Sequence, residues 1–297
     1  MEVHTEMRLD VRDGHKKKLA RIISMSHEKP MDFANSLEWD IGVDRRLFPK
    51  KPKHGWLYGT RFHDQLTQEQ QLECLWMEIA RDVSMFISLE QTIPVLYMGY
   101  VNQYQGVLSS DIHEYLMIFS KEEIVHTLVF IRYLEEARLP MYAGEGSAQI
   151  LLGELPKLPP ALGILYTLII EWMAELAVME STQSDDIEPI TKALFGNHHF
   201  DESRHIAFGR WISEFYIEQC SEKELVQIRD MVAGLLERMT PAYTFNPDIA
   251  DYVSFEYPID KNDASQVQLV CESQANQTLN KKRFKHVFEW LEKINLL

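Results

Sequence analysis

Two Glu-x-x-His pairs, Glu123 with His126 and Glu202 with His205, occur in this chain of 297 residues, each within a run of helical composition. Residues three apart lie on one face of a helix, about one turn from each other. Each pair therefore points a carboxylate and an imidazole in the same direction. A single pair arises readily by chance, but two pairs on separate helices predict that the four side chains serve one site.

Carboxylates in apolar surroundings are also found on the helix that precedes each pair. Glu90 has mainly apolar neighbours, although an exposed Glu on an amphipathic helix is the alternative interpretation; Glu171 and Glu175 follow a largely apolar run. An ionised carboxylate in such surroundings is costly unless a cation or hydrogen bonds compensate. One Glu from each of two helices, with Glu-x-x-His from two others, is the ligand arrangement of a dinuclear metal site in a ferritin-like protein. We therefore predict an all-α, ferritin-like four-helix bundle.

Capping and helix-breaking residues predict the boundaries of the helices. Thr67 and Gln70 form a capping-box pattern, Asp111 is a favourable N-cap, and Pro94 predicts a kink. The expected bundle helices cover residues 69–97, 111–138, 161–180 and 190–219. The connection 139–160 is long enough to cross the bundle. No alternating run is long enough to build a sheet.

We expect a single domain, 1–297, with three parts. Residues 1–60 form an N-terminal arm with one short helix, 61–219 form the four-helix bundle that holds the predicted dinuclear metal site, and 220–297 form a C-terminal helical extension. In the extension, Ser221 and Glu224 cap a helix that ends near residue 239, and a last helix covers about 274–296. Four aromatic residues are expected to pack the arm on the bundle: Trp39, Phe48, Trp56 and Tyr58.

The positions of the carboxylates along the two expected hairpins agree with a shared site. In an antiparallel hairpin, residues equidistant from the turn lie at the same height. The midpoint between Glu90 and Glu123 falls near Gly106, in the first expected turn. The midpoint between Glu171 and Glu202 falls in the acidic second turn. Both pairs are therefore predicted to lie level.

The third and fourth helices offer more than the minimum number of ligands. Glu171 matches the height of Glu202 better than Glu175 does, so we favour Glu171 as the ligand and Glu175 as a hydrogen-bonding neighbour. His198 lies four residues before Glu202, and His205 lies three after it. The three side chains share one helix face, which makes His198 an additional candidate ligand.

Four neighbouring polar residues are not expected to bind metal. Glu122 lacks a His three residues later and is expected to be solvated. His199 is rotated about 100° from His198, which favours a surface or supporting position. Asp201 and Arg204 either support ligating imidazoles on neighbouring helices or form a solvated salt bridge.

Composition restricts the class of protein. The net charge of −15 argues against nucleic acid, and no basic amphipathic stretch favours a membrane. The three scattered cysteines indicate neither a disulfide framework nor a thiolate metal site. The start of the chain lacks the apolar segment of a signal peptide, and the longest apolar run, 161–170, is too short to span a bilayer. We expect a soluble, cytoplasmic protein. The oxygen and nitrogen donors of the candidate Glu and His ligands suit iron or manganese better than zinc or Cu(I).

Three motifs carry a resemblance to a known family: Leu57-Tyr58-Gly59-Thr60, Glu122-Glu123-x-x-His126 and His198-x-x-x-Glu202-x-x-His205. Over about 55–210 the chain resembles the diiron N-oxygenases typified by p-aminobenzoate N-oxygenase. One turn after His126 it has Phe130, where ribonucleotide reductase small subunits usually carry a radical Tyr. The resemblance implies seven metal ligands: Glu90, Glu123, His126, Glu171, His198, Glu202 and His205.

The resemblance also implies two iron ions, O2 as co-substrate, an external electron donor and a homodimer. The expected reaction is N-oxygenation of a small amine, free or carrier-tethered, to a hydroxylamine, nitroso or nitro product in a secondary-metabolite pathway. A diiron hydroxylase or desaturase acting on carbon and a non-enzymatic, metal-binding ferritin-like protein are the alternatives. Four apolar residues near the ligands either line a substrate pocket or belong to the core: Phe86, Ile93, Phe130 and Met173.

Overall fold

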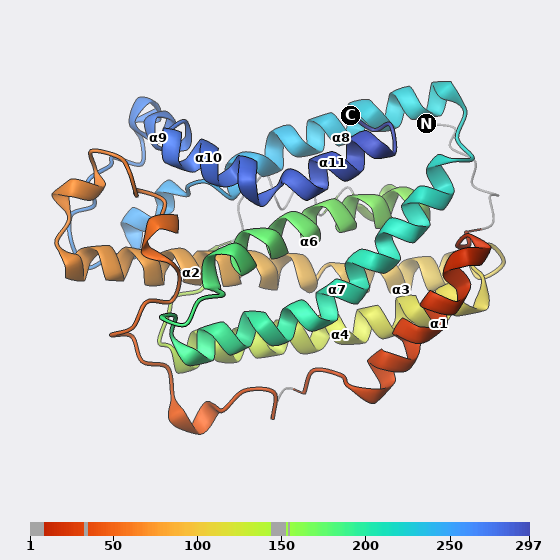
Figure 1. Cartoon of the computed structure of the whole chain (residues 1–297), viewed down its shortest axis with the longest axis horizontal. Coiled ribbons are helices and arrows are strands. Elements are labelled where there is room, and N and C mark those ends of the chain that lie inside the picture. The colour runs from red at the N-terminus through yellow and green to blue at the C-terminus, as the bar shows by residue number, and fades with distance from the viewer. Residues whose placement is uncertain (1–8, 33–34, 144–152, 154) are drawn as a thin grey trace.

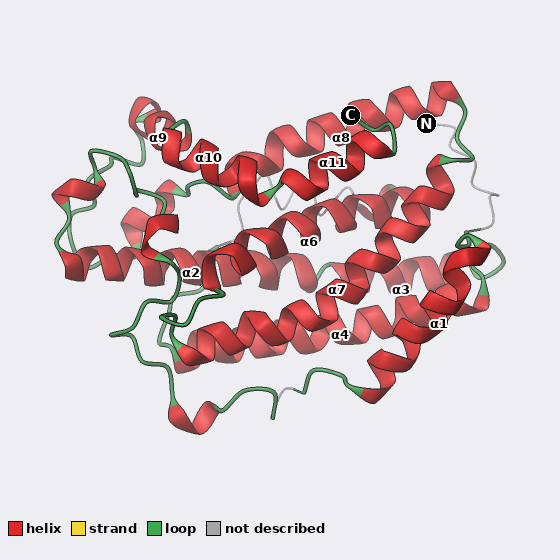
Figure 2. Cartoon of the chain, in the orientation of Figure 1, coloured by secondary structure: helices red, strands yellow, loops and turns green. Residues whose placement is uncertain are grey.

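The computed structural model describes residues 9–32, 35–143, 153 and 155–297. These residues form helices and irregular segments, and two isolated bridges are the only β-type pairings among them (Figure 2). The helices are α1 (Asp13–Glu28), α2 (Gln68–Glu90), α3 (Ile93–Gln103), α4 (Ser110–Glu136), α6 (Pro160–Thr182), α7 (Pro189–Ile217), α8 (Glu222–Ala242), α9 (Ala264–Cys271), α10 (Gln274–Arg283) and α11 (Lys285–Lys293). Short 3₁₀ turns lie at Trp39–Ile41, Pro52–His54, His63–Gln65, Leu155–Lys157 and Pro247–Asp251. The predicted all-α class is confirmed.

Four helical segments form the bundle. The consecutive helices α2 and α3 run antiparallel to α4, and α6 runs antiparallel to α7 (Figure 1). Contacts of α4 with α7 and of α3 with α6 join the two hairpins. The hairpin turns lie at 104–109 and 183–188. They contain the sequence midpoints between Glu90 and Glu123 and between Glu171 and Glu202, as predicted. Two hairpins joined by one long connection have the topology of a ferritin-like bundle.

The first bundle segment is broken rather than kinked. The sequence predicts one helix over 69–97, but α2 ends at Glu90, and Gln91 and Thr92 separate it from α3. Pro94 has no N–H, and its ring clashes with the carbonyl four residues earlier, which is that of Glu90. The predicted start is confirmed, because Thr67 and Gln70 form a reciprocal capping box.

The start of α4 differs from the prediction by two residues. Its N-cap is Ser109, and Asp111 lies in the first helical turn. A carboxylate in that turn interacts favourably with the positive end of the helix dipole, so it is compatible with a helix start without capping it.

Helix α6 is the central helix of the molecule. It contacts α3, α7, α8, α10 and α11, and its side chains are buried on nearly all sides. Its 23 residues are long and apolar enough to cross a membrane, so the shortness of the run 161–170 does not by itself exclude a span. Burial inside the protein accounts for a helix that is apolar all round.

The N-terminal arm packs on the bundle through α1 and two tryptophans. Helix α1 lies across α4 and α7 (Figure 1). Trp39 and Trp56 are buried as predicted, but Phe48 and Tyr58 are 40% and 41% exposed. Backbone pairing holds this part of the arm instead, because the carbonyl of Phe48 accepts a hydrogen bond from the N–H of Glu188. The expected chain start and the crossover connection fall partly on 1–8, 144–152 and 154, outside the described residues.

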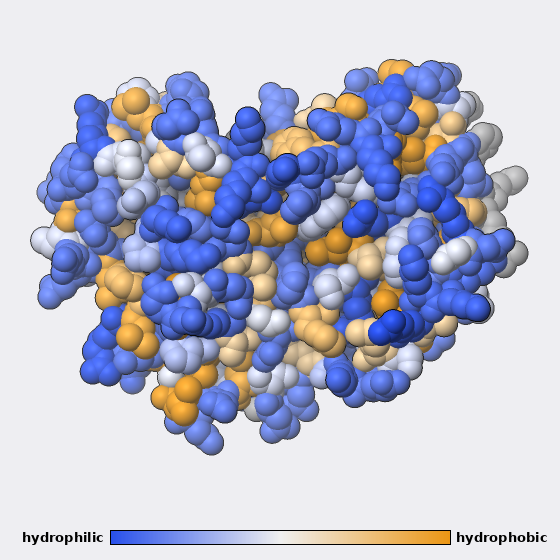
Figure 3. Space-filling model, viewed as in Figure 1, coloured by the Kyte–Doolittle hydropathy of each residue, from blue (hydrophilic) through white to orange (hydrophobic). Residues whose placement is uncertain are grey.

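The C-terminal extension covers α6 with α8, α10 and α11 (Figure 1). Ser221 and Glu224 cap α8 as predicted. The predicted last helix over 274–296 is instead two helices that meet at Phe284, a buried side chain against Tyr243. Helix α9 has no counterpart in the prediction. The face seen in Figure 3 is largely hydrophilic, with scattered apolar patches.

Candidate metal centre

The seven candidate ligands come from all four bundle segments, and each is at least 96% buried. Six of them form two groups whose oxygen and nitrogen atoms lie within 4.8 Å of one another. The first group is Glu90, His126, His198 and Glu202, and the second is Glu123, Glu202 and His205. Glu202 belongs to both groups and therefore lies between two possible cation positions.

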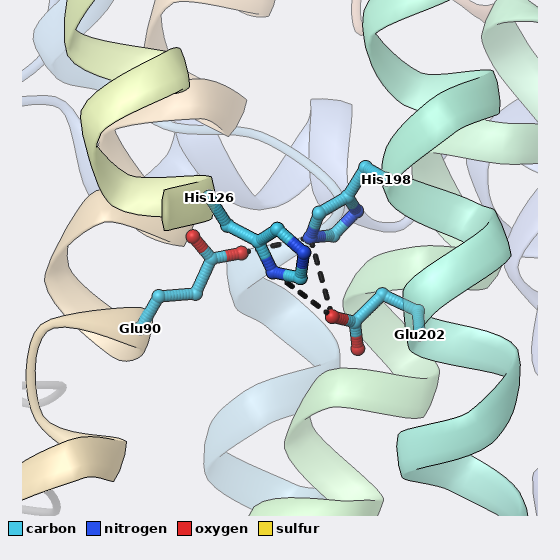
Figure 4. Close-up of side chains that lie close together, drawn as sticks. All are labelled: Glu90, His126, His198 and Glu202. Carbon is cyan, nitrogen blue, oxygen red and sulfur yellow. Dashed lines mark hydrogen bonds and ion pairs between the residues drawn. The ribbon is translucent and has the colours of Figure 1, made fainter. Parts of the chain in front are cut away.

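In the first group, two imidazoles face two carboxylates (Figure 4). Nε2 of His198 lies 2.9 Å from Oε1 of Glu90 and 3.4 Å from Oε1 of Glu202. Nδ1 of His126 lies 3.4 Å from the same Glu202 oxygen. These donor atoms come from α2, α4 and α7, which shows that the bundle, and not one local motif, creates the group.

In the second group, one imidazole faces two carboxylates. Nδ1 of His205 lies 2.9 Å from Oε1 of Glu123 and 3.1 Å from Oε1 of Glu202. Burial alone would lower the pKa of His205, but the charge of Glu202 and hydrogen bonding to the carboxylates of Glu122 and Glu123 outweigh it and raise that pKa well above its usual value. The environment thus favours a positive charge at this position.

Glu171 and Glu175 on α6 occupy different positions relative to the groups. Glu171 belongs to neither group, but its Oε1 is buried without a hydrogen-bond partner, and burial together with repulsion from Glu123 raises its pKa. Glu175 binds Nδ1 of His198 at 3.1 Å and Nδ1 of the half-exposed His199 at 2.6 Å. Glu175 therefore contacts the His198 nitrogen that faces away from the two groups, whereas the charge of the Glu171 carboxylate interacts directly with that of Glu123.

Each of the three imidazoles has a carboxylate on its outward nitrogen. Glu175 contacts Nδ1 of His198, and Asp201 accepts a hydrogen bond from Nε2 of His126, each at 3.1 Å. Oε2 of Glu122 lies 2.8 Å from Nε2 of His205. Such pairs fix the tautomer and orientation of a ligating His and raise its basicity.

The expectation that Glu122 is solvated is wrong. Glu122 is 2% exposed, and Arg204 joins it to Asp201 with contacts of 2.6 and 2.7 Å. The Nε of Arg204 also donates to Ser26 on α1. The charges of Asp201 and Arg204 are buried rather than solvated, so of the two roles left open for this pair, the structure shows the supporting one.

The buried polar atoms and the charge of this region fit two cations. Five atoms of the site form no well-aligned hydrogen bond with the described residues: Oε2 of Glu90, both carboxylate oxygens of Glu123, Nδ1 of His126 and Oε1 of Glu171. Two of them, Oε1 of Glu123 and Nδ1 of His126, have only the ion-pair contacts given above. Burial and the nearby Glu202 charge raise the pKa values of Glu90 and Glu123 to about 7. A cation removes the repulsion and supplies a partner for each of these atoms. Donor atoms at about 2.1 Å from a metal and at right angles lie about 3 Å apart, close to the spacings observed here.

Aromatic rings close the site on the side of His198. Phe86 and Phe130 stack at 5.3 Å, and their rings lie 5.2 and 5.0 Å from the His198 ring. Both are buried, as are Ile93 and Met173. Water is therefore kept from the outer face of this imidazole by rings from α2 and α4.

Comparisons with known proteins identify the family. No curated protein matches the chain. A solved structure of a mutant R2-like ligand-binding oxidase with an aerobically reconstituted Mn/Fe cofactor is similar at 14% identity and a TM-score of 0.47, covering 92% of this chain and 94% of the other. The family model for p-aminobenzoate N-oxygenase AurF matches residues 12–295, which confirms the resemblance found in the motifs. The chain therefore belongs to the p-aminobenzoate N-oxygenase AurF family of oxidoreductases.

Proposed function

We propose that this enzyme uses O2 to oxygenate the nitrogen of a small amine at a diiron site. The proposal rests on one observation above all: three imidazoles and several carboxylates, some of whose oxygens form no hydrogen bond with the described residues, converge in the buried interior from all four bundle segments. Family membership supports N-oxygenation over reaction at carbon. We assign seven residues as the ligands: Glu90, Glu123, His126, Glu171, His198, Glu202 and His205.

Two iron ions held by these residues would supply the activation of O2, with electrons from an external donor. The protein's own contribution begins with fixed ligand geometry. Glu175, Asp201 and Glu122 hold the outward nitrogens of the imidazoles, so the inward nitrogens keep their lone pairs directed at the cluster.

The second contribution is a dry environment that keeps the amine reactive. Oxygen transfer needs the lone pair of the nitrogen, which a protonated amine lacks. Because burial in apolar surroundings disfavours a charged group, a site walled by Phe86 and Phe130 favours the neutral amine. Successive oxygenations of the same nitrogen would give the hydroxylamine, nitroso and nitro products.

We further propose that the substrate is a small molecule, free or tethered to a carrier protein, and that the enzyme works in the cytoplasm as a homodimer. Four apolar residues near the ligands are proposed to shape its pocket: Phe86, Ile93, Phe130 and Met173. The −15 net charge suits an electron donor with a basic surface.

Turnover with labelled oxygen tests the proposal. Reduced, iron-loaded protein is exposed to ¹⁸O2 with a panel of aryl and alkyl amines and, separately, with fatty acids, and the products are analysed by mass spectrometry. We expect ¹⁸O on nitrogen in amine products and about two irons per chain. Label on carbon alone, or loading of many irons per chain, would contradict it. Glu123→Ala and His205→Ala should abolish iron binding, and exposed Glu135→Gln is the matched control.

A further inference from the structure

An uninterrupted series of aromatic contacts runs from His205 to the far end of α3. The ring of Phe119 stacks on His205 with centroids 3.5 Å apart, and Tyr97 meets Phe119 edge-on at 4.9 Å. Tyr97 and Tyr100 are 6.3 Å apart, and Tyr100 and Tyr104 are 6.1 Å apart. Each ring therefore lies next to its successor, from a candidate metal ligand outward.

The three tyrosines lie on one face of α3 because they are three and four residues apart. Tyr97 and Tyr100 are 1% and 3% exposed, whereas Tyr104, the C-cap of α3, is half-buried. The series thus begins in the dry interior and ends at the surface, beside the α3–α4 turn.

The two inner phenols are held in place with their protons. Thr167 donates to the carbonyls of its own helix, so its Oγ1 is free to accept from Oη of Tyr97 at 2.6 Å. Oη of Tyr100 donates to the carbonyl of Leu158 at 3.0 Å. Neither acceptor is a base, so an electron can pass through these rings only if their protons stay in place.

We propose that Phe119, Tyr97, Tyr100 and Tyr104 form a one-electron relay between the metal centre and the surface. The inference rests on the proposed function, because the oxidant is the O2-oxidised centre. One electron passes from Tyr104 through the intervening rings to that centre, and the phenolic proton of Tyr104 goes to water. Tyr97 and Tyr100 return to their starting state, and one electron from a thiol reductant in solution, together with a proton from water, restores the phenol of Tyr104.

Such a relay matters when O2 reacts and no amine is bound. An oxidised centre without substrate would otherwise take electrons from its own ligands or from the rings around them. The relay moves the electron vacancy to a side chain at the surface, where it can be refilled without damage to the site.

A neighbouring tyrosine provides a matched control. Tyr115 is fully buried and lies 6.1 Å from the same Phe119 ring. Its other ring contact among the described residues is Phe208, so no series leads from it to the surface. Tyr115→Phe removes a phenol at similar depth without interrupting the proposed route.

The experiment exposes reduced, iron-loaded protein to O2 without amine. Radicals are detected by freeze-quench EPR, and their positions are found by spin trapping and peptide mass spectrometry. Wild type and Tyr115→Phe should carry the trap on Tyr104. Tyr97→Phe and Tyr100→Phe keep the shape of the rings but are harder to oxidise, so labelling of Tyr104 should fall by more than about tenfold, a barrier increase of about 1.4 kcal/mol.

Iron oxidation, followed with an iron(II) chelator, separates the two proposals. Iron that is oxidised without a radical on Tyr104, unchanged labelling in Tyr100→Phe, or an equal loss in Tyr115→Phe would each overturn the relay and leave the proposed function standing. Iron that stays ferrous in O2 would overturn both. Circular dichroism and thermal unfolding establish that each variant is folded.

Discussion

Oε2 of Glu122 lies 2.8 Å from Nε2 of His205, across the interface of α4 and α7. Both side chains are at least 98% buried, and Arg204 bonds to the other oxygen of Glu122. The carboxylate therefore holds the outward nitrogen of the imidazole while Nδ1 faces the cluster. Because Glu122 is next to Glu123 in sequence, adjacent residues of α4 contact the two opposite nitrogens of one ring.

Glu122→Gln should weaken metal binding without abolishing it. The amide retains the size of the side chain but loses the charge that orients His205 and pairs with Arg204. Loss of such supporting groups typically reduces metal affinity by about 10- to 100-fold. Anaerobic titration with Fe(II) or Co(II) measures the effect, and Glu135→Gln, an exposed change on the same helix, is the control. Equal affinities in the two variants would contradict the supporting role.

Substitutions on α6 should separate the roles of its two buried carboxylates. Glu171→Ala removes a side chain that interacts with the cluster, so we expect fewer metal ions bound per chain. Glu175→Ala removes only the partner of His198 and His199, so the number of bound ions should stay the same while affinity falls. Metal analysis after gel filtration gives the stoichiometry. The reverse pattern would assign Glu175 as the ligand.

The metal-free protein should become less stable as pH rises, in part because of Glu90. Burial raises the pKa of Glu90 from 4.5 to about 7, so between these values the folded state binds more protons than the unfolded state. The resulting stabilisation is complete below about pH 4.5 and is lost as pH approaches 7, by at most about 1.4 kcal/mol per pH unit. Glu90→Gln lacks this contribution. Urea unfolding in the presence of a chelator gives the free energy of unfolding of both proteins. The wild-type value minus the variant value should fall between pH 5 and pH 7. A difference that does not change with pH would contradict the prediction.

Gly163→Ala should destabilise the fold. A Cβ at this position would lie 1.8 Å from Oη of Tyr100, which is buried and bonded to Leu158. Forcing an extra methyl group into packed surroundings typically costs about 1–3 kcal/mol. Gly196→Ala on α7 is the control, because the nearest described atoms to its Cβ would be those of the Gln183 side-chain amide, 3.9 Å away. Thermal unfolding of both variants gives the comparison, and equal midpoints would show that Tyr100 moves aside freely.

The sequence predicts the bundle well because its signals are local and redundant. Each pair of carboxylates is equidistant in sequence from one of the two hairpin turns. Capping boxes begin α2 and α8, and the spacing of His198, Glu202 and His205 places all three on one helix face. The break after Glu90 was only partly predictable. Pro94 indicates a disturbance, but whether a helix bends or stops depends on how the neighbouring helices pack.

Glu175 was predicted as a hydrogen-bonding neighbour, and a supporting role for Asp201 and Arg204 was one of two alternatives. The supporting role of Glu122 could not be predicted, because its partner is distant in the sequence. Glu122 has no local feature that distinguishes it from a solvated Glu, and its partner His205 is 83 residues away. The exposure of Phe48 and Tyr58 likewise depends on backbone pairing between the arm and the start of α7. Composition places aromatic residues in the core on average and cannot identify the exceptions.

Because of the break between α2 and α3, Glu90 is the proposed metal ligand whose backbone can move most easily. Six of the proposed ligands lie well inside α4, α6 and α7, where any backbone displacement strains hydrogen bonds on both sides. Glu90 is the last residue of its helix, and Pro94 offers no N–H to its carbonyl. When the charge or coordination of the metals changes, the adjustment should therefore be concentrated at Glu90, while the imidazoles keep their positions.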